Sequence, residues 1–262
     1  MSKLKIWNEE EWDRGAKKCA QKLPLKVPRH MPNMIPIAES GIKWKGLVYL
    51  IRHDKEKIIK RYLLKHPLRY ATRLLASLCK KKSYTRDRDF FFYNLKDATE
   101  FIQLANHPQA LIVVGFSYCH KPLECPSGRF STECIHDPEH PVCRQCFIGK
   151  AVNALPEKAV IPLFITTIHY IGGTLLELQD QHPDKKLLFL ITACEMTLEM
   201  FGDFGNMIRV PGIGVRLDGR ICNTMRAFDL SEKGIKPGLT IVREETQSRM
   251  LELIAALRDA KK

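Results

Sequence analysis

The chain has 262 residues, of which 45% are hydrophobic and 27% are charged, so it is long enough to bury an ample core. Its formal net charge is +13, and the excess is concentrated, because Lys43 to Arg88 holds fifteen Lys and Arg against three acidic residues. The N-terminus lacks the apolar core of a signal peptide, and the longest uncharged run, Ala159 to Leu176, contains a proline and a Gly-Gly pair that argue against a membrane span. We therefore exclude secretion and expect a cytoplasmic protein with reduced thiols rather than a disulfide framework.

The first 41 residues are expected to be irregular. Prolines recur there at every fourth position, at Pro24, Pro28, Pro32 and Pro36. A proline inside a helix lacks the donor N–H and clashes with the preceding turn. We interpret this stretch as an extended connector or a wrapping arm.

A basic helical region is predicted next, from about Lys55 to Lys82, with a break near Pro67. Its apolar residues fall at the three- and four-residue steps of one helical face: Leu64, Leu68, Ala71, Leu75 and Leu78. Its other face carries Lys60, Arg61, Lys65, Arg69 and Arg73. Residues 1–100 are therefore predicted to form a basic, helical N-terminal extension. We expect it to bind an anionic membrane surface rather than nucleic acid, or else to be a solvated helix face that covers the domain.

From Ala110 onward, apolar strands alternate with helices. Strands are expected at 111–116, 160–166, 187–192, 208–215 and 239–242, and helices at 148–155, 173–181 and 244–259. Continuously hydrophobic strands are typical of a parallel sheet that helices cover on both faces. Residues 101–262 are therefore predicted to form a cysteine-rich α/β domain with a mostly parallel, Rossmann-like sheet.

Seven of the nine cysteines lie between Cys119 and Cys222, and most of them follow a predicted strand. Because the ligand crevice of an open α/β sheet lies beyond the carboxyl ends of its strands, we expect these thiols to converge. The predicted metal ligands are Cys119, Cys125, Cys143, Cys146, Cys194 and Cys222. The role of Cys134 stays open, and Cys19 and Cys79 are interpreted as small apolar residues.

Zinc and iron–sulfur clusters both suit thiolate ligands. Structural zinc usually draws on two compact pairs of ligands, so thiols dispersed over strand ends favour an iron–sulfur cluster, of the 4Fe–4S type, with zinc as the alternative. His120, His136 and His140 are candidates to replace one cysteine, although the last two lie in a segment that has the composition of a solvated loop.

Two polar segments predict a binding site beside the thiols. Residues 172–174, Gly-Gly-Thr, are expected between a strand and a helix, where backbone N–H groups receive an anion or Thr174 simply caps the helix. Residues 212–224 surround Cys222 with arginine, amide and hydroxyl groups, which suits a polar ligand or a plain surface turn. The predicted binding residues are Gly172, Gly173, Thr174 and Arg216, and the predicted catalytic residues are Glu195, Asn223 and Thr224.

Six short motifs occur in a fixed order: Cys125-Pro126, Cys143-x-x-Cys146, Gly172-Gly173-Thr174, Ala193-Cys194-Glu195, Pro211-x-Ile213-Gly214, and Cys222-Asn223-Thr224 with Asp229. Between about Cys119 and Leu239 this order resembles the prokaryotic domain-of-unknown-function family 116. Its members are suspected iron–sulfur proteins without an established activity, and many carry N-terminal membrane segments. The resemblance implies a common site but no reaction.

This chain departs from the family pattern at two places. Members commonly have a denser cysteine group with a glycine between its last two thiols, whereas here Phe147 follows Cys146 and Cys134 stands apart. The basic region also stands where other members have a membrane segment. The assignment of ligands within the loop that carries the cysteines is therefore left open.

These patterns together predict an iron–sulfur enzyme with its cluster at the carboxyl edge of the sheet. A cluster with one iron that the protein does not ligate would act on a small polar or anionic substrate by Lewis-acid, redox or sulfur chemistry. The alternative is a zinc-stabilised module without enzymatic activity that binds a membrane surface or nucleic acid through its basic region.

Overall fold

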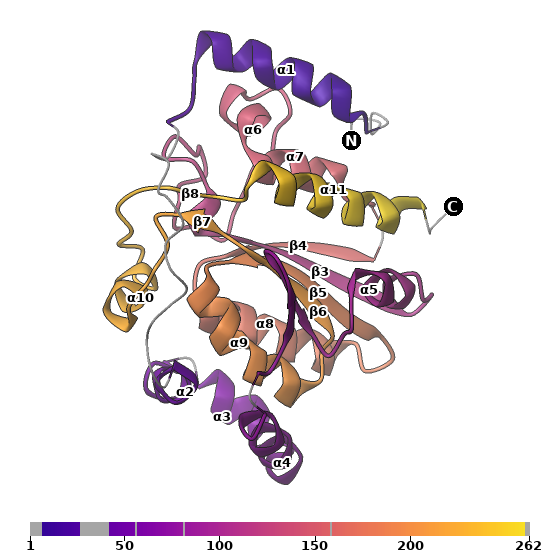
Figure 1. The fold of residues 1–262 in the computed structure, drawn as a ribbon, viewed down its shortest axis with the longest axis vertical. Helices are drawn as coiled ribbons and strands as arrows, with labels where there is room; N and C mark the ends of the chain where they lie inside the picture. The colour runs from indigo at the N-terminus through magenta and orange to yellow at the C-terminus, as the bar shows by residue number, and fades with distance from the viewer. Residues whose placement is uncertain (1–6, 27–41, 56, 81, 158, 260–262) are drawn as a thin grey trace.

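A six-stranded β-sheet lies at the centre of the computed structural model, which describes residues 7–26, 42–55, 57–80, 82–157 and 159–259 (Figure 1). The strands run in the order β1-β2-β6-β5-β3-β4. Neighbours among β3, β4, β5 and β6 are parallel, whereas β2 pairs antiparallel with both β1 and β6. The prediction of an α/β fold with a mostly parallel sheet is therefore confirmed. The six strands are β1 (Thr85–Asp87), β2 (Phe90–Tyr93), β3 (Ala110–Ser117), β4 (Val160–Ile165), β5 (Lys186–Ala193) and β6 (Gly212–Arg216).

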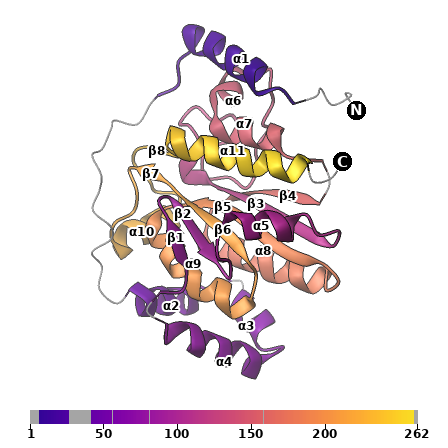
Figure 2. The same cartoon turned by 45° about the vertical axis from the view of Figure 1, so that its right-hand side comes forward.

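Helices cover both faces of this sheet (Figures 1 and 2). One face carries α5 (Ala98–Ala105), α7 (Phe147–Ala154) and α11 (Glu244–Asp259). The other face carries α8 (Ile168–Gln181) and α9 (Glu195–Ile208), and an outer group of helices packs on these two: α2 (Ile42–Arg52), α3 (Ile58–Leu63) and α4 (Pro67–Leu78). None of the described helices is both long and apolar enough to cross a membrane.

The remaining elements lie at the edges of these layers. They are α1 (Glu9–Lys22), the short 3-10 helix η1 (Tyr118–His120), α6 (Pro141–Gln145), β7 (Asp218–Gly219), α10 (Met225–Ser231) and β8 (Thr240–Ile241). The last predicted strand corresponds to β8, but it pairs with β7 in a separate two-stranded sheet rather than joining the central one.

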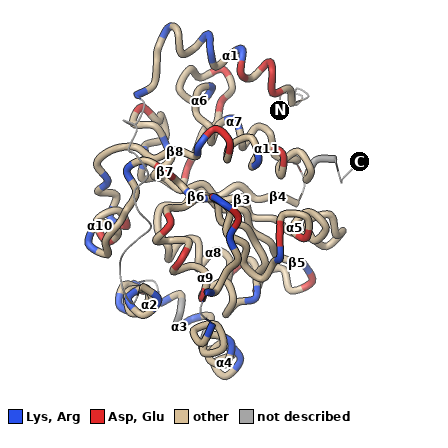
Figure 3. Tube along the Cα trace, viewed as in Figure 1, with Lys and Arg blue, Asp and Glu red and all other residues tan. Residues whose placement is uncertain are grey.

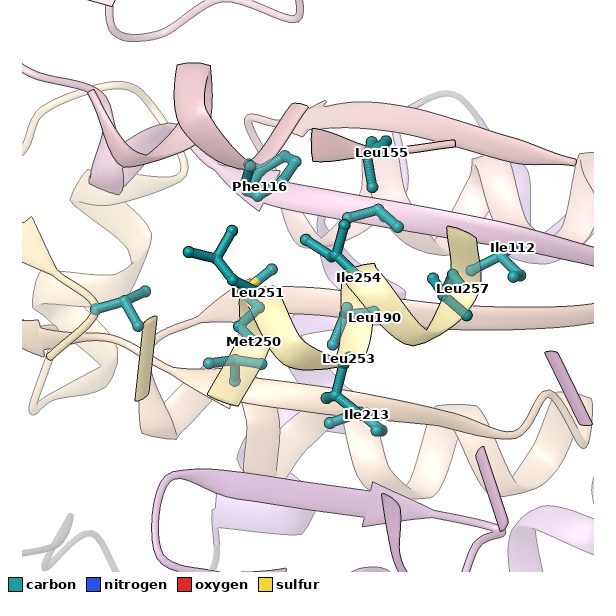
Figure 4. Packing of buried hydrophobic residues seen from close by; sticks show 14 of the residues in the cluster. Ile112, Phe116, Leu155, Leu190, Ile213, Met250, Leu251, Leu253, Ile254 and Leu257 are labelled. Atoms are coloured by element: carbon teal, nitrogen blue, oxygen red, sulfur yellow. The ribbon is translucent and has the colours of Figure 1, made fainter. Parts of the chain in front are cut away.

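Alternate residues of β3 point to opposite faces of the sheet, which explains its continuous apolar sequence. Ile112, Val114 and Phe116 belong to one core, and Val113 belongs to the other. Figure 4 shows Ile254 of α11 packed over the first of these cores. Each side chain of this size stabilises the fold by about 1.5–3 kcal/mol when it is fully buried.

The order of the parallel strands creates a topological switch between β3 and β5. The chain leaves β3 for β4 on one side, and β5 then pairs with the other side of β3. Ligands of open α/β sheets bind in the crevice outside the carboxyl ends of strands at such a point. Ser117 and Ala193 end the two strands, so the segments that follow them border this crevice.

Helix α1 corrects the expectation of an irregular N-terminal stretch. Asn8 caps this helix by accepting the N–H of Glu11 at 3.0 Å, and acidic residues in its first turn suit the positive end of the helix dipole. Trp12 is buried, and Arg144 of α6 donates to its carbonyl. The prolines begin only after α1 has ended, at Pro24. Most of the predicted connector, including the other three prolines, lies outside the described residues.

Three expected boundaries also differ from the structure. The sheet extends past the predicted domain boundary at residue 100, because β1 and β2 lie in it. The fourth predicted strand begins at Gly212 rather than at Ile208, because α9 continues to Ile208 and Arg209 ends it in the left-handed conformation (φ 55°). The expected helix start at Gly173 is wrong, since α8 already begins at Ile168.

Candidate metal centre

The seven cysteines between Cys119 and Cys222 separate into two groups rather than the single set that the sequence predicted. Four thiols lie around a small cavity formed by the loop of residues 121–140, the cysteine loop, and by α6 and α7; we call this the four-thiol site. It contains Cys125, Cys134, Cys143 and Cys146. The three-thiol site contains Cys119 after β3, Cys194 after β5, and Cys222 after β7. All nine cysteines of the chain are free thiols.

Backbone N–H groups surround the sulfurs of the four-thiol site. Cys146 is the N-cap of α7, and the N–H groups of Ile148 and Gly149 face its sulfur and favour its thiolate, although neither makes a capping hydrogen bond. Burial is the larger influence and raises the pKa of Cys146 to about 12. The N–H of His136 faces Cys134 in the same way. A bound metal cation would reverse the effect of burial, because metals bind the thiolate form.

Gly149 allows α7 to approach the end of α6 closely. A Cβ atom at this position would lie 2.2 Å from the carbonyl oxygen of Cys143, so no other residue fits there without moving the backbone. This close approach turns the chain between α6 and α7 and brings Cys143 and Cys146 into the same cavity.

Lys121 holds the cysteine loop from inside. Its side chain is 1% exposed, and its Nζ donates to the carbonyl oxygens of Gly128 at 3.3 Å, Ser131 at 2.9 Å and Glu133 at 2.6 Å. Burial lowers the pKa of Lys121, and thiolates at the four-thiol site, Cys125 first among them, oppose that effect. The ammonium therefore fixes the loop and also supplies a positive charge beside the four thiols.

The three-thiol site is buried and also contains a lysine. The Nζ of Lys236 lies 3.5 Å from the Sγ of Cys222 and also interacts with Cys119. Cys194 and Cys222 lie close enough to share a proton, which lowers the pKa of Cys222 to about 6 and raises that of Cys194 well above its usual value. The positive charge of Lys236 acts to lower the pKa of both thiols, which adds to the shift of Cys222 and opposes that of Cys194. The site thus favours one thiolate next to one ammonium.

Arg129 joins the two sites through the backbone. Its guanidinium donates to the carbonyl oxygens of Lys121 at 3.2 Å and Cys119 at 3.3 Å on one side. On the other side it donates to those of Lys236 at 3.3 Å and Gly238 at 3.0 Å. The segment that carries Lys236 is therefore tied to the segment that carries Cys119 and Lys121.

The donor chemistry of both sites fits a thiolate-bound centre, because each combines several buried or half-buried thiols with a lysine ammonium, buried at Lys121 and half-buried at Lys236. Among the described residues, no group of three or more His, Cys, Asp or Glu side chains is arranged to hold a single metal ion. The cavity of the four-thiol site is about 10 Å³, which is the lower limit for one water molecule. A cluster would therefore fit this site only if residues that line the cavity moved apart.

Glu195 and Arg216, predicted for catalysis and binding, lie in a buried ion-pair network. Arg86 contacts Glu195 at 2.5 Å, and Arg216 contacts Glu195 at 3.7 Å and Asp89 at 2.8 Å. Thr246 of α11 donates to the same aspartate at 2.8 Å. These contacts tie β1, β2, α9, β6 and α11 together, so each predicted site residue has a structural partner. Their action on a substrate stays a prediction.

The remaining predicted site residues are dispersed. Thr224 caps α10 by accepting the N–H of Ala227 at 3.2 Å, and Asn223 is exposed beside it. Gly172 and Gly173 lie inside α8 and line an apolar pocket of about 160 Å³ beneath α2 and α4. The prediction that residues 172–174 form an anion site at a helix N-terminus is therefore wrong, because Thr167, not Thr174, caps α8.

The three histidines have different surroundings. His140 caps α6 by accepting the N–H of Val142 at 3.2 Å, and the Nδ1 of His136 lies 2.8 Å from the carbonyl oxygen of Cys134. His120 is buried and stacks on Phe147, with 5.5 Å between the ring centroids. Burial lowers the pKa of His120 to about 4. Its Nδ1 has no hydrogen-bond partner within the described part of the chain.

Sequence reasoning missed Lys121, Lys236 and Arg129. A lysine or arginine in a polar segment normally predicts solvent exposure, and nothing in its immediate neighbours signals a buried partner. Cys134, whose role the sequence left open, belongs to the four-thiol site. Cys134 lies nine residues from both Cys125 and Cys143, and this wide spacing does not indicate that the three thiols line one cavity.

Comparison of the chain with protein-family models, with curated proteins and with solved structures finds no match. The family resemblance described above therefore stays a prediction.

Replacing Lys121 by Met should lower the free energy of unfolding of the metal-free protein by about 3 kcal/mol, because three carbonyl groups of the cysteine loop lose a charged donor. Urea unfolding at pH 7 measures this change. The exposed Lys96→Met variant is the matched control and should differ from wild type by less than about 0.5 kcal/mol. Equal stability of the two variants would contradict the role assigned to Lys121.

Stability of the metal-free protein should also fall in mild acid because of His120. The pKa of His120 in the folded chain is about 4, below its ordinary value of 6.5, so between these values the unfolded chain binds a proton that the folded chain does not. The contribution of neutral His120 to the free energy of unfolding is complete above pH 6.5 and is lost as the pH falls, so that about 2 kcal/mol is lost at pH 5. His120→Phe should remove that part of the difference between urea unfolding at pH 7 and at pH 5, whereas substitution of the exposed His66 by Gln should not. An unchanged pH dependence in His120→Phe would show that other groups cause it.

Proposed function

We propose that this chain is an iron–sulfur protein with two centres, and that the three-thiol site is the reactive one. The observation that carries this proposal is the division of seven cysteines into a set of four and a set of three, each beside a lysine ammonium: the buried Lys121 and the half-buried Lys236. Four thiolates complete the ligation of a cluster, whereas three leave one position open. The fold would serve this site as Rossmann-like sheets do, by presenting it at the carboxyl ends of its strands.

The proposed roles of the two sites differ. At the four-thiol site, Cys125, Cys134, Cys143 and Cys146 would hold a 4Fe–4S cluster that the protein ligates fully. At the three-thiol site, Cys119, Cys194 and Cys222 would hold the second. A cluster with one iron that lacks a protein ligand supplies a Lewis acid, an electron carrier or a source of sulfur.

The dispersal of Cys119, Cys194 and Cys222 over strand ends favours an iron–sulfur centre over zinc at the three-thiol site, because structural zinc usually draws on two compact pairs of ligands. The N–H groups around Cys146 and the ammonium of Lys121 also stabilise the negative charge that thiolate-bound clusters carry. Zinc stays the alternative for the four-thiol site.

The three-thiol site favours a small polar or anionic substrate. Lys236 places a positive charge beside Cys222, and the exposed Asn223 follows this cysteine directly in the chain. An anionic group on the substrate would therefore find a cation next to the open position. Thiols with these properties need a reducing compartment, so the proposal places the protein in the cytoplasm.

Protein prepared without oxygen should be brown, with broad absorption near roughly 400 nm and with acid-labile sulfide, because thiolate-bound iron absorbs there. Cys146→Ser and Cys194→Ser should each remove about half of the iron and sulfide, since each disrupts one of two centres. Brief oxidation should produce the electron paramagnetic resonance signal of a 3Fe–4S cluster in Cys146→Ser but not in Cys194→Ser, because only the three-thiol site leaves one iron without a protein ligand.

Cys19→Ser and Cys79→Ser are the matched controls, because these cysteines belong to neither site, and both variants should keep the full iron content. Stoichiometric zinc without sulfide after anaerobic reconstitution would overturn the proposal. If Cys194→Ser keeps the wild-type iron content, the three-thiol site holds no iron. That result would refute a reactive centre at the three-thiol site and would leave iron at the four-thiol site alone.

A further inference from the structure

Helices α2 and α4 expose apolar side chains at the end of the molecule opposite α1 (Figures 1 and 2). Leu68 is 82% exposed and Trp44 is 62% exposed. The other large exposed apolar residues of this region are Val48, Ile51, Leu64 and Leu75. Single exposed apolar residues are ordinary on a protein surface, but a group of them on neighbouring helices indicates a contact surface. We call these six residues the apolar face.

The apolar face is the outer side of helices whose inner side is already packed. In α4, Leu74 belongs to the core beneath the helix, and Ser77 donates to Asp203 of α9 at 2.6 Å. Leu68 and Leu75 are seven residues apart, so they share the opposite side of the helix. Of the leucines that the sequence grouped on one helical face, Leu64, Leu68 and Leu75 are thus exposed, and within the described residues nothing covers them. Leu78 instead lines the apolar pocket beneath α2 and α4.

A cleft of about 500 Å³ lies beside α4 and is rich in cations. One acidic residue, Asp180, lines it, and this residue pairs with Lys65 at 2.7 Å. Burial lowers the pKa of Arg73, and the neighbouring guanidinium groups of Arg69 and Arg209 lower it further by repulsion. The Lys and Arg residues that line the cleft are Lys65, Arg69, Arg73, Lys185, Lys186 and Arg209. A bound anion would relieve this repulsion.

The surrounding helices are basic throughout. Residues 42–80 contain eleven Lys and Arg and two acidic residues, a net charge of +9. Figure 3 shows these cations along α2, α3 and α4. Lys and Arg next to exposed Trp and Leu are typical of helices that lie in the interface of an anionic membrane, where apolar side chains enter the acyl region and cations meet the phosphates. Nucleic acid would use the cations but would leave the leucines in water.

We infer that α2, α3 and α4 bind the surface of an anionic phospholipid membrane. The apolar face enters the acyl boundary, and the cleft beside α4 receives headgroup phosphates at Arg69 and Arg73. This inference does not depend on the metal centres, because none of the residues that carry it belongs to either thiol site.

The test is sedimentation of the full-length protein with vesicles of phosphatidylcholine, with and without phosphatidylglycerol. Binding should require phosphatidylglycerol and should weaken as salt is added. Leu68→Ser and Leu75→Ser should each weaken it about tenfold, the effect of removing one buried leucine from the acyl boundary. Leu23→Ser is the matched control, since Leu23 is also exposed but lies next to α1 at the opposite end, and it should bind as wild type does.

Tryptophan emission gives a second, independent measurement. Trp44 is exposed, Trp12 is buried and Trp7 is half-buried, so contact with anionic vesicles should shift the emission of Trp44 to shorter wavelength. Trp44→Phe should abolish the shift while sedimentation persists, because phenylalanine keeps the apolar contact. Arg69→Ser should weaken binding at low salt.

Three results would overturn the inference. One is failure of the wild-type protein to bind anionic vesicles at low salt. Another is equal binding by wild type, Leu68→Ser and Leu75→Ser, which would leave no role for the apolar face. The third is saturable binding of duplex DNA or of free glycerophosphate without any vesicle binding, which would assign the cations to a different anion.

Discussion

The arrangement of both thiol sites depends on two lysine ammonium groups, one buried at Lys121 and one half-buried at Lys236. A buried charge is costly unless hydrogen bonds or opposite charges compensate it, and Lys121 uses all three of its donors on carbonyl groups of the cysteine loop. Lys236 instead faces sulfur, so its charge is best compensated when Cys222 is a thiolate. Arg129 connects the backbones of both lysines. The loops are therefore organised around charges that favour negative sulfur.

The sheet determines which thiols reach this place. Cys119 and Cys194 follow strands that are neighbours in space, although the two cysteines are 75 residues apart in sequence, and Cys222 follows β7, which pairs with β8. The three-thiol site therefore exists only in the folded chain. The four-thiol site is more local, because all of its cysteines lie within one loop and the two helices after it. Binding of a metal centre would consequently be coupled more strongly to folding at the three-thiol site.

The sequence predicts the layers of the fold well, because continuous apolar strands such as β3 and β5 leave few alternatives. Two of the wrong predictions arose although a local capping signal was present. The prolines suggested an irregular N-terminus although Asn8 and Glu11 signal a helix start, and Gly172 and Gly173 suggested a loop although Thr167 caps the helix earlier. The division of the cysteines into four and three could not be predicted, since it depends on the path of the cysteine loop. That path is fixed by a lysine whose burial has no local signature.

The apolar face and the three-thiol site are physically connected through α2. Tyr49 of α2 packs in one apolar cluster with Cys194 and Cys222, and its ring lies 5.1 Å from that of Phe228 in α10. Close-packed interiors transmit small displacements rather than absorb them. A shift of α2 would therefore move the wall of the three-thiol site. Because α2 also carries Trp44, the surface that we infer to bind a membrane and the site that holds the thiols share one structural element.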